Sequence, residues 1–579
     1  MNATLESLPT RADTRTQFSV GHVVWLTLVL AAAVLRLTDL AGLPLSPAEA
    51  THALSTYAIW HPATAAAGGS PLAANLTALL TPVLGDGDAV MRLIPALAGL
   101  SLVLLPWLWR DWLGQLGALA ATSLLALSPI QSVVARTAGG DALALAAGMW
   151  LLVAGWRWLD SAESRWFLLS VAALALGLAT SPLFYTLLLS LGLGLGLQRL
   201  VGPPLMDSRP TISPILRQQA LGLGVGLFLV VGAGVLWRPE GLGQAAALLS
   251  QWLANFGGAN DGLLRVTPLL ALGRYEPALL TLGLPAIVWA TWRGEARSLF
   301  LVYWLAAILA FMFVQKDALT NSALITLPAY LLVGIVISWA APQLNGRWWW
   351  LGALFSLILT GLLWVNLVRY ARIGGNQSTA LLPIMLTGLL LLISLGVLLL
   401  LSLALPGGGI LRGALVGWLL FLAYLNWGTG WWLSHQAAND PRERWVLTGT
   451  SSELLLFDRT VRQVSYQATG NDRALTILSS VDTPALRWYL RDFEHVTYVA
   501  AIPAGANALA IITDAATTPT LEGRYLATRF AWLTAEASPQ LPRVADSVEI
   551  LRWWLFHESP MSVDKTSLTL WLNAARVNR

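Results

Sequence analysis

Residues 380–404 read ALLPIMLTGLLLLISLGVLLLLSLA, a run without a single charged side chain. A helix that crosses the hydrocarbon core of a bilayer needs roughly 20 predominantly apolar residues. Comparable stretches recur along three quarters of the chain. They lie near 19–38, 89–109, 114–129, 138–156, 166–180, 182–198, 218–237, 277–292, 298–314, 321–340, 348–368, 380–404 and 413–431. The sequence therefore predicts an all-α polytopic membrane domain over 19–431, with about 13 spans.

The composition agrees with a membrane protein and excludes several functions. Of the 579 residues, 56% are hydrophobic and only 11% are charged, against about 25% charged in soluble proteins. A net charge of +4 is too small to indicate nucleic-acid binding. The absence of cysteine excludes disulfides and thiol chemistry.

Charge becomes denser near the C-terminus. Of the 31 acidic residues, 15 follow Trp431, so we expect residues 440–579 to form a separate water-facing domain. RALTILSS, HVTYVAAI and NALAIITDA are typical of strands, and TPALRWYLRDF places its apolar residues on one helical face. These patterns predict a small α/β domain with a βαβ-like layer. Near its end, Trp553 and Trp554 either dock at the membrane interface or belong to the core.

Arginine and lysine in short loops predict the orientation, because cytoplasmic loops carry an excess of them. If the tail at 1–18 is cytoplasmic, twelve such residues before Trp431 lie inside and nine outside. Thirteen spans then place the C-terminal domain outside the cytoplasmic membrane. Two long outer loops, 39–88 and 238–276, complete the predicted organisation.

The outer loops gather side chains capable of chemistry. In the first, SPAEATHALSTYAIWHP places Glu49, His52 and Tyr57 near helical spacing, which predicts a helix on the membrane surface. A carboxylate there can act as a general base or a metal ligand; the alternative is a solvated helix face. In the next outer loop, Arg136 and Asp141 are either an ion pair or ligands for an anion and a cation.

Tyr275, Glu276 and Lys316 each precede an apolar stretch, where such side chains either anchor a helix or contribute to a site. The sequence contains no P-loop, dinucleotide fingerprint, zinc spacing or hydrolase elbow. We therefore expect no nucleotide cofactor, and energy must come from the substrate or from an ion gradient.

Several of these residues follow a family pattern in order along the chain. The pattern comprises Arg36, Ala48-Glu49-Ala50-Thr51-His52, Ser70-Pro71, Gly85, Arg92-Leu93, Pro95, LSPIQSVVARTAGGDAL and KDALTNSALITLPAYLL. With these motifs in this order, the chain resembles the GT-C superfamily of membrane glycosyltransferases, in the branch of the protein O-mannosyltransferases and aminoarabinose transferases. The resemblance covers roughly 20–430 and is strongest over 36–150.

The resemblance implies an enzyme in the cytoplasmic membrane of a prokaryotic cell, with membrane lipids around it. It would transfer a sugar from a polyprenyl-phosphate donor to an unknown hydroxyl acceptor on a protein, lipid or glycan, by an inverting direct displacement on the outer face. No nucleic acid takes part.

The resemblance also assigns roles to residues. Glu49 would be the base or a metal-organising carboxylate, sharing a divalent cation (Mg or Mn) with Asp141. Arg92, Arg136 and Lys316 would hold the donor phosphate, with Asp141 alternatively orienting Arg136. His52, Tyr275 and Glu276 would contact substrate.

Two positions depart from the family pattern. The usual first-loop Asp-Glu is Ala48-Glu49 here, and a Thr-Lys pair is replaced by Thr180-Ser181-Pro182. Ala48 motivates an alternative, a catalytically silent relative that binds polyprenyl lipid or acts as a scaffold. A transporter or flippase is a weaker alternative, because the halves show no internal repeat and the charges gather outside rather than at mid-membrane.

Overall fold

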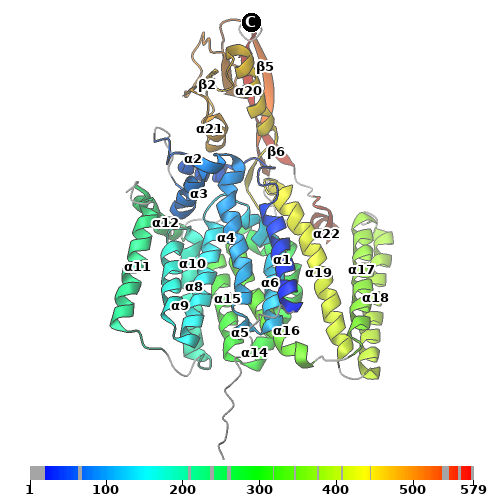
Figure 1. Ribbon diagram of the computed structural model, residues 1–579. Coiled ribbons are helices and arrows are strands. Elements are labelled where there is room, and N and C mark those ends of the chain that lie inside the picture. Colours follow the sequence, from blue (N-terminus) through cyan, green and yellow to red (C-terminus); the bar gives the residue numbers. More distant parts are fainter. Residues whose placement is uncertain are drawn as a thin grey trace, which may run out of the picture.

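A helical bundle carries a small mixed-sheet domain at one end (Figure 1). In this computed structural model the described residues are 20–62, 68–205, 210–234, 240–256, 262–316, 319–343, 347–373, 377–405, 408–443, 445–536, 547–558 and 562–574. The predicted cytoplasmic tail, residues 1–18, lies outside them.

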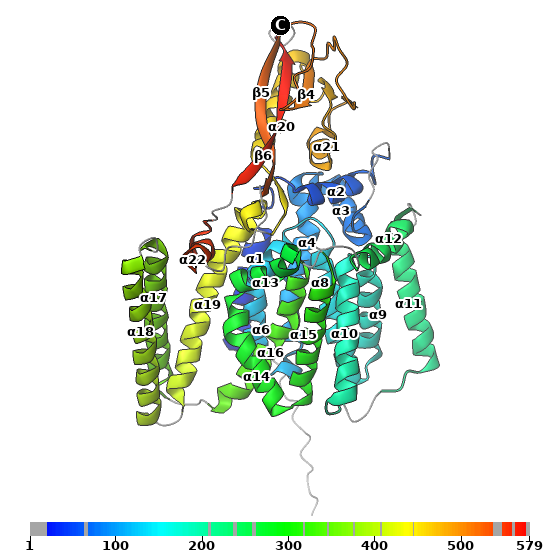
Figure 2. The ribbon, with the colours of Figure 1, turned by 180° about the vertical axis from the view of Figure 1, so that it is seen from behind.

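Ten helices in the described part of the chain are long and apolar enough to cross a membrane. They run side by side through the bundle (Figures 1 and 2). They are α1 (Val20–Leu37), α4 (Asp88–Leu108), α8 (Asp141–Ser161), α10 (Pro182–Val201), α11 (Pro214–Gly232), α15 (Ala296–Val314), α16 (Asn321–Gln343), α17 (Trp349–Ile373), α18 (Gln377–Ala404) and α19 (Gly409–His435). The predicted helical membrane fold is confirmed.

Three of the thirteen expected spans have a different form. The stretch 114–129 is part of a pair of helices, α6 (Gln115–Leu127) and α7 (Pro129–Ala135), which meet at 60°. Counting that pair as one span raises the number to 11. The stretch 166–180 is the shorter α9 (Ser164–Gly177), and 277–292 is the π-helical turn η1 (Leu279–Gly283) followed by α14 (Leu284–Arg293). A four-residue helix, α5 (Arg110–Leu113), connects α4 to α6. By length and composition, thirteen spans are therefore not confirmed.

The bundle core is apolar and tightly packed. Trp109 stacks on Trp112 with ring centroids 4.1 Å apart, and Trp304 is 1% exposed. Where α17 meets α19, a Cβ on Gly413 would lie 1.6 Å from the carbonyl oxygen of Trp349. Those two helices therefore pack backbone against backbone, which only glycine allows.

The two segments predicted as outer loops lie at the same end of the bundle as the C-terminal domain (Figures 1 and 2). The first holds α2 (Pro47–Tyr57) and α3 (Pro71–Leu84), and the second holds α12 (Glu240–Ala254) and α13 (Gly262–Tyr275). The predicted loops 39–88 and 238–276 are thus largely helical.

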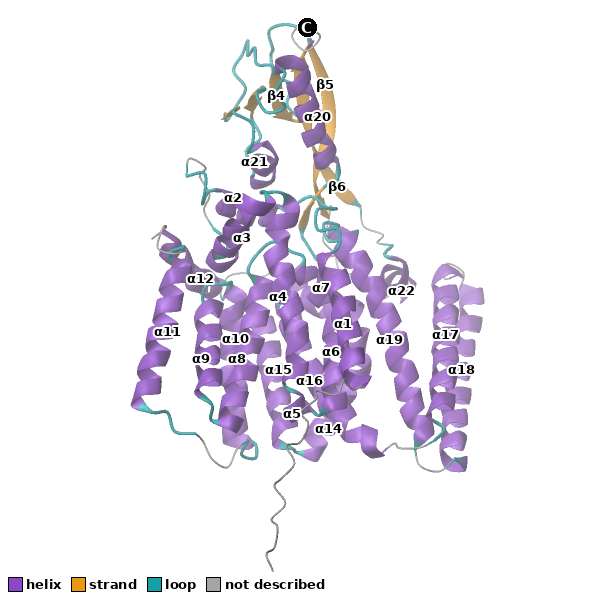
Figure 3. Ribbon diagram, viewed as in Figure 1, coloured by secondary structure: helices purple, strands orange, loops and turns teal. Residues whose placement is uncertain are grey.

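The C-terminal domain contains a six-stranded sheet in the order β1-β5-β6-β4-β2-β3. Its strands are drawn in orange in Figure 3. After a short 3-10 turn, η2 (Pro441–Glu443), the elements are β1 (Thr448–Thr450), α20 (Glu453–Thr469), β2 (Thr476–Ser479), α21 (Pro484–Leu490), β3 (His495–Tyr498), β4 (Ala510–Asp514), β5 (Tyr525–Glu536), α22 (Ser547–Phe556) and β6 (Val563–Asn573). Because β2 pairs in parallel with both β3 and β4, the predicted βαβ-like layer is confirmed. The antiparallel β5–β6 pair was not predicted.

Candidate active site

The start of α2 is fixed by its own sequence. Ser46 caps the helix, Pro47 occupies its first turn, and Glu49 closes a capping box: the Glu49 N–H donates to Ser46 Oγ, while the Ser46 N–H donates to Glu49 Oε2 at 2.9 Å. A capping box satisfies two N–H groups that a helix start otherwise leaves without partners. Glu49 is therefore part of the local structure of α2.

The Glu49 carboxylate also forms a buried, two-point ion pair with Arg92 of α4. Arg92 Nε donates to Oε1 and Nη2 to Oε2, both at 2.8 Å. Oε1 accepts a further bond from the N–H of Ala138 at 2.9 Å. Although burial would raise the pKa of the Glu49 carboxyl, the charge and hydrogen bonds of Arg92 and the two backbone N–H groups lower it below its usual value.

This geometry favours a positioning role for Glu49. A carboxylate that already accepts four hydrogen bonds and has a lowered pKa is a weak proton acceptor. Its catalytic role remains a prediction.

The two arginines expected to hold phosphate are engaged by backbone carbonyls. Besides the Glu49 bonds, Arg92 donates to Leu40, Leu43 and Pro44 oxygens, so all five of its N–H groups have partners. Arg136 donates to the carbonyl oxygens of Arg36, Thr38, Asp39 and Ser434. In this conformation both guanidinium groups tie the first loop to the bundle, and Arg136 is not oriented by Asp141.

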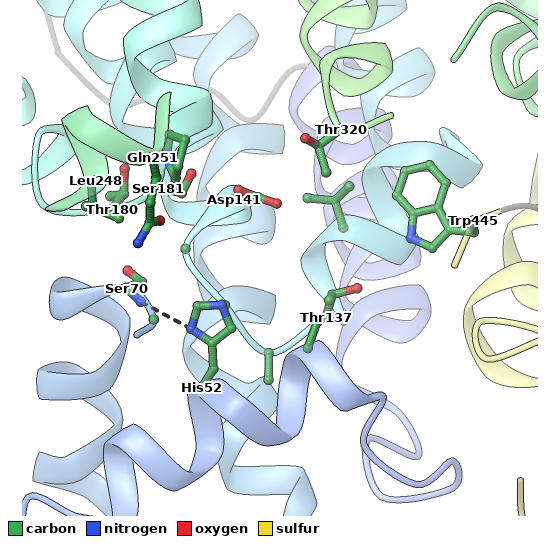
Figure 4. Close-up of a pocket in the computed structure, with 17 residues that line it drawn as sticks. His52, Ser70, Thr137, Asp141, Thr180, Ser181, Leu248, Gln251, Thr320 and Trp445 are labelled. Atoms are coloured by element: carbon green, nitrogen blue, oxygen red, sulfur yellow. Dashed lines mark hydrogen bonds between the residues drawn. The ribbon is translucent and has the colours of Figure 1, made fainter. Parts of the chain in front are cut away.

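A cavity of about 290 Å³ lies beside α2, between the α7–α8 turn, the first turn of α10, α12 and the loop before α16. Its polar lining is His52, Ser70, Thr137, Asp141, Thr180, Ser181, Gln251 and Thr320. Figure 4 shows Asp141 in the middle, between the Ser181 side and the side formed by Thr320 and Trp445. Asp141 is the one carboxylate among the described lining residues.

The cavity depends on close backbone packing at the start of α8. A Cβ on Gly140 would lie 2.1 Å from the carbonyl oxygen of Thr180, so only glycine brings the α7–α8 turn this near the α9–α10 turn. Both positions that depart from the family pattern lie in the cavity wall, because Ala48 and the Thr180-Ser181 pair line it. Ser181 Oγ is buried there without a hydrogen-bond partner.

His52 is a neutral donor at the cavity wall. Its Nδ1 accepts from the Ser70 N–H at 3.1 Å (Figure 4), so the proton of the neutral ring is on Nε2. Burial lowers the pKa of His52 below its usual value, against a smaller opposing effect of Glu49. The ring is therefore uncharged near pH 7 and can donate to a ligand oxygen.

A resident metal does not fit the described residues. No group of three His, Asp or Glu side chains comes together in the described ranges. Of the expected ligand pair, Asp141 lines the cavity, whereas Glu49 is bonded to Arg92 and lines a separate space of about 40 Å³. We therefore derive no catalytic step through a cation.

The remaining predicted site residues outside the first loop are not among the described residues that line the cavity. Tyr275 donates to Glu443 Oε2 at 2.5 Å, and Glu276 accepts from Ser128 and Tyr330. The Lys316 N–H donates to the Asn255 carbonyl at 3.0 Å. These contacts join helices and loops and do not place the side chains at the cavity.

Trp445 and Ser181 line the cavity but were not predicted as site residues. Trp445 lies in the connection between η2 and β1. No pattern in the sequence predicts that this segment lies beside α2. The departure at Thr180-Ser181 was a usable signal, because it marked the position where the family has a cation.

Comparisons with known proteins agree with this architecture. A family model described as dolichyl-phosphate-mannose-protein mannosyltransferase matches residues 61–195. The structure of ArnT from Cupriavidus metallidurans bound to undecaprenyl phosphate is similar, with 17% identity, 90% of this chain and 99% of that one covered, and a TM-score of 0.55. The chain has the GT-C glycosyltransferase fold.

The apo structure of the same ArnT gives 18% identity, 81% and 84% coverage and a TM-score of 0.52. A comparison with curated proteins finds no match. The family model and the two ArnT structures confirm the resemblance to the GT-C superfamily that was predicted from the sequence.

Proposed function

We propose that this GT-C chain transfers a sugar from a polyprenyl-phosphate donor to a hydroxyl acceptor on the extracytoplasmic side of the membrane. The observation that carries the proposal is the cavity beside α2. Its wall carries one acid, a histidine, hydroxyl groups and an aromatic ring among apolar side chains of the bundle. The ArnT neighbour with undecaprenyl phosphate bound supports a donor of this class.

The reaction we propose is a single displacement. The acceptor oxygen attacks the anomeric carbon as the bond from that carbon to the phosphate oxygen breaks. The polyprenyl phosphate leaves with the electron pair, and the acceptor proton passes to a carboxylate. Because attack comes from the face opposite the leaving group, the configuration inverts.

Asp141 fits the role of base better than Glu49, because Asp141 lines this cavity whereas Glu49 lines a separate, smaller space. The His52 Nε2–H and Ser181 Oγ are suited to bind sugar or phosphate oxygens. Arg92 and Arg136 do not line this cavity, and they stabilise it by holding the first loop in place.

The test uses purified full-length protein and radiolabelled polyprenyl-phosphate hexoses with membrane acceptors. We expect Asp141→Asn to lower transfer by at least a hundredfold, in the range of general-base contributions of about 10²–10⁴, while binding of polyprenyl phosphate persists. We also expect a chelator to leave the wild-type rate unchanged. Transfer by the Asp141→Asn variant at the wild-type rate would exclude Asp141 as the base.

Ala48 in the cavity wall is the one observation that favours a second function, a silent relative that binds polyprenyl lipid. Binding of donor lipid without transfer of any hexose by the wild-type protein would support that function instead.

A further inference from the structure

The segment that leads into α2 is held by side chains distant in sequence. The Pro44 carbonyl accepts from Arg92 and, at 2.6 Å, from Asn439 Nδ2. The Leu45 N–H donates to the hydroxyl of Tyr489 in α21 at 3.0 Å. The Leu45 carbonyl accepts from Thr450 Oγ1 in β1 at 2.8 Å. The N–H and the carbonyl of this buried residue are therefore both hydrogen-bonded to side chains of the C-terminal domain.

Tyr489 is itself oriented by the membrane domain. Its hydroxyl donates to Asp88 Oδ2 at 2.8 Å, and Trp488 Nε1 donates to Asp88 Oδ1 at 2.7 Å. Asp88 begins α4, one helical turn before Arg92. One tyrosine hydroxyl thus connects the start of α4 to the segment before α2.

A cation next to these aromatic residues strengthens the contact. The Arg491 guanidinium lies 3.6 Å from the ring centroid of Trp488 and donates to the Asp86 carbonyl at 3.0 Å. Trp488 is fully buried and Tyr489 is 5% exposed. Desolvated hydrogen bonds of this kind are costly to break, because the groups left behind find no water.

We propose that Tyr489 is a positioning residue for the active site. By holding Leu45, it sets where the start of α2 lies relative to the bundle, and so where Ala48 and His52 lie in the cavity wall. The C-terminal domain then does more than cover the bundle, because it determines the shape of the site. The kinetic consequence rests on the proposed glycosyl transfer, whereas the positioning itself does not.

Hydrogen–deuterium exchange of the full chain in lipid nanodiscs tests the positioning directly. Tyr489→Phe removes the hydroxyl and leaves the buried Leu45 N–H without an acceptor. We expect amides in residues 45–50 to exchange about tenfold faster, which corresponds to the loss of about one hydrogen bond. The matched control is Tyr525→Phe, which loses a bond to the Ala508 carbonyl within the C-terminal domain and leaves α2 unchanged.

Thr450→Val is a second variant for the same segment, and we expect it to raise exchange over the same residues. Unchanged exchange there in both variants, relative to wild type and Tyr525→Phe, would overturn the proposal.

Kinetics distinguish positioning from general destabilisation. In Tyr489→Phe we expect kcat for sugar transfer to fall about tenfold while binding of sugar-free polyprenyl phosphate is retained, because only the α2 side of the cavity moves. Raised exchange in the variant without transfer by the wild type would sustain the positioning and refute the proposed function. An equal loss of kcat in Tyr525→Phe would refute the specific role of Tyr489.

Discussion

Glu49→Gln tests whether the first-loop acid supports the structure or carries the chemistry. Glutamine keeps one oxygen for Arg92 Nε and the Ala138 N–H, but its amide NH₂ would face two other donors, Arg92 Nη2 and the Ser46 N–H. Both partners of the ion pair are less than a tenth exposed. Removing one partner of a buried pair costs about 3–5 kcal/mol, so we expect a large loss of stability.

The assay is thermal unfolding in detergent, followed by tryptophan fluorescence at one fixed scan rate because membrane proteins often unfold irreversibly. Glu163→Gln is the matched control. It breaks the exposed ion pair with Arg165, and such pairs contribute about 0–1 kcal/mol. We therefore expect the unfolding temperature to fall clearly in Glu49→Gln and to stay near wild type in Glu163→Gln.

The stability that Glu49 contributes depends on pH in a defined direction. Because folding lowers the pKa of Glu49 below its usual 4.5, the stability it contributes is present above pH 4.5 and is lost as the pH falls through the lowered value. A Glu49→Gln protein that unfolds at the wild-type temperature yet transfers no sugar would refute the positioning role and restore Glu49 as the base.

Two further outcomes are expected. Gly413→Ala should lower the unfolding temperature by forcing α17 from α19, whereas Gly428→Ala, whose added Cβ would meet nothing within 4 Å, should not; equal unfolding temperatures would contradict the backbone packing. Since the folded state lowers the pKa of His52 below 6.5, stability should decline as the pH falls from 6.5 through that lowered value. Denaturant titrations should show this decline in wild type and a flatter profile in His52→Leu, and identical profiles would show that His52 does not titrate differently on folding.

Much of the fold could be predicted from short stretches of sequence, because the hydrophobicity and spacing of neighbouring residues determine whether a segment forms a helix or a strand. An uncharged run such as 380–404 must be a helix in lipid, where every backbone polar group has to be satisfied within its own segment. The strands β2 and β4 followed from short apolar runs, and α21 from the spacing of Leu486, Tyr489 and Leu490. The order of family motifs likewise identified the GT-C resemblance.

The sequence could not predict the partner of each charged group. Arg92 and Arg136 are residues of a type that often binds phosphate. Arg92 instead donates to the Glu49 carboxylate and to first-loop carbonyls, and Arg136 donates to backbone carbonyls alone. Hydrogen bonds of this kind depend on which loop lies within about 3 Å, and that is set by packing between segments far apart in the chain.

The sequence by itself determined that the protein is a polytopic helical membrane protein with a C-terminal α/β domain, because hydrophobicity and periodicity act over a few residues. Only the tertiary structure decided that Asp141 lines the cavity while Glu49 lies behind it, and that Tyr489 reaches Leu45 across more than four hundred residues of sequence. Those relations depend on the close packing of α2, α4, α8 and α21, which no single segment of the sequence encodes.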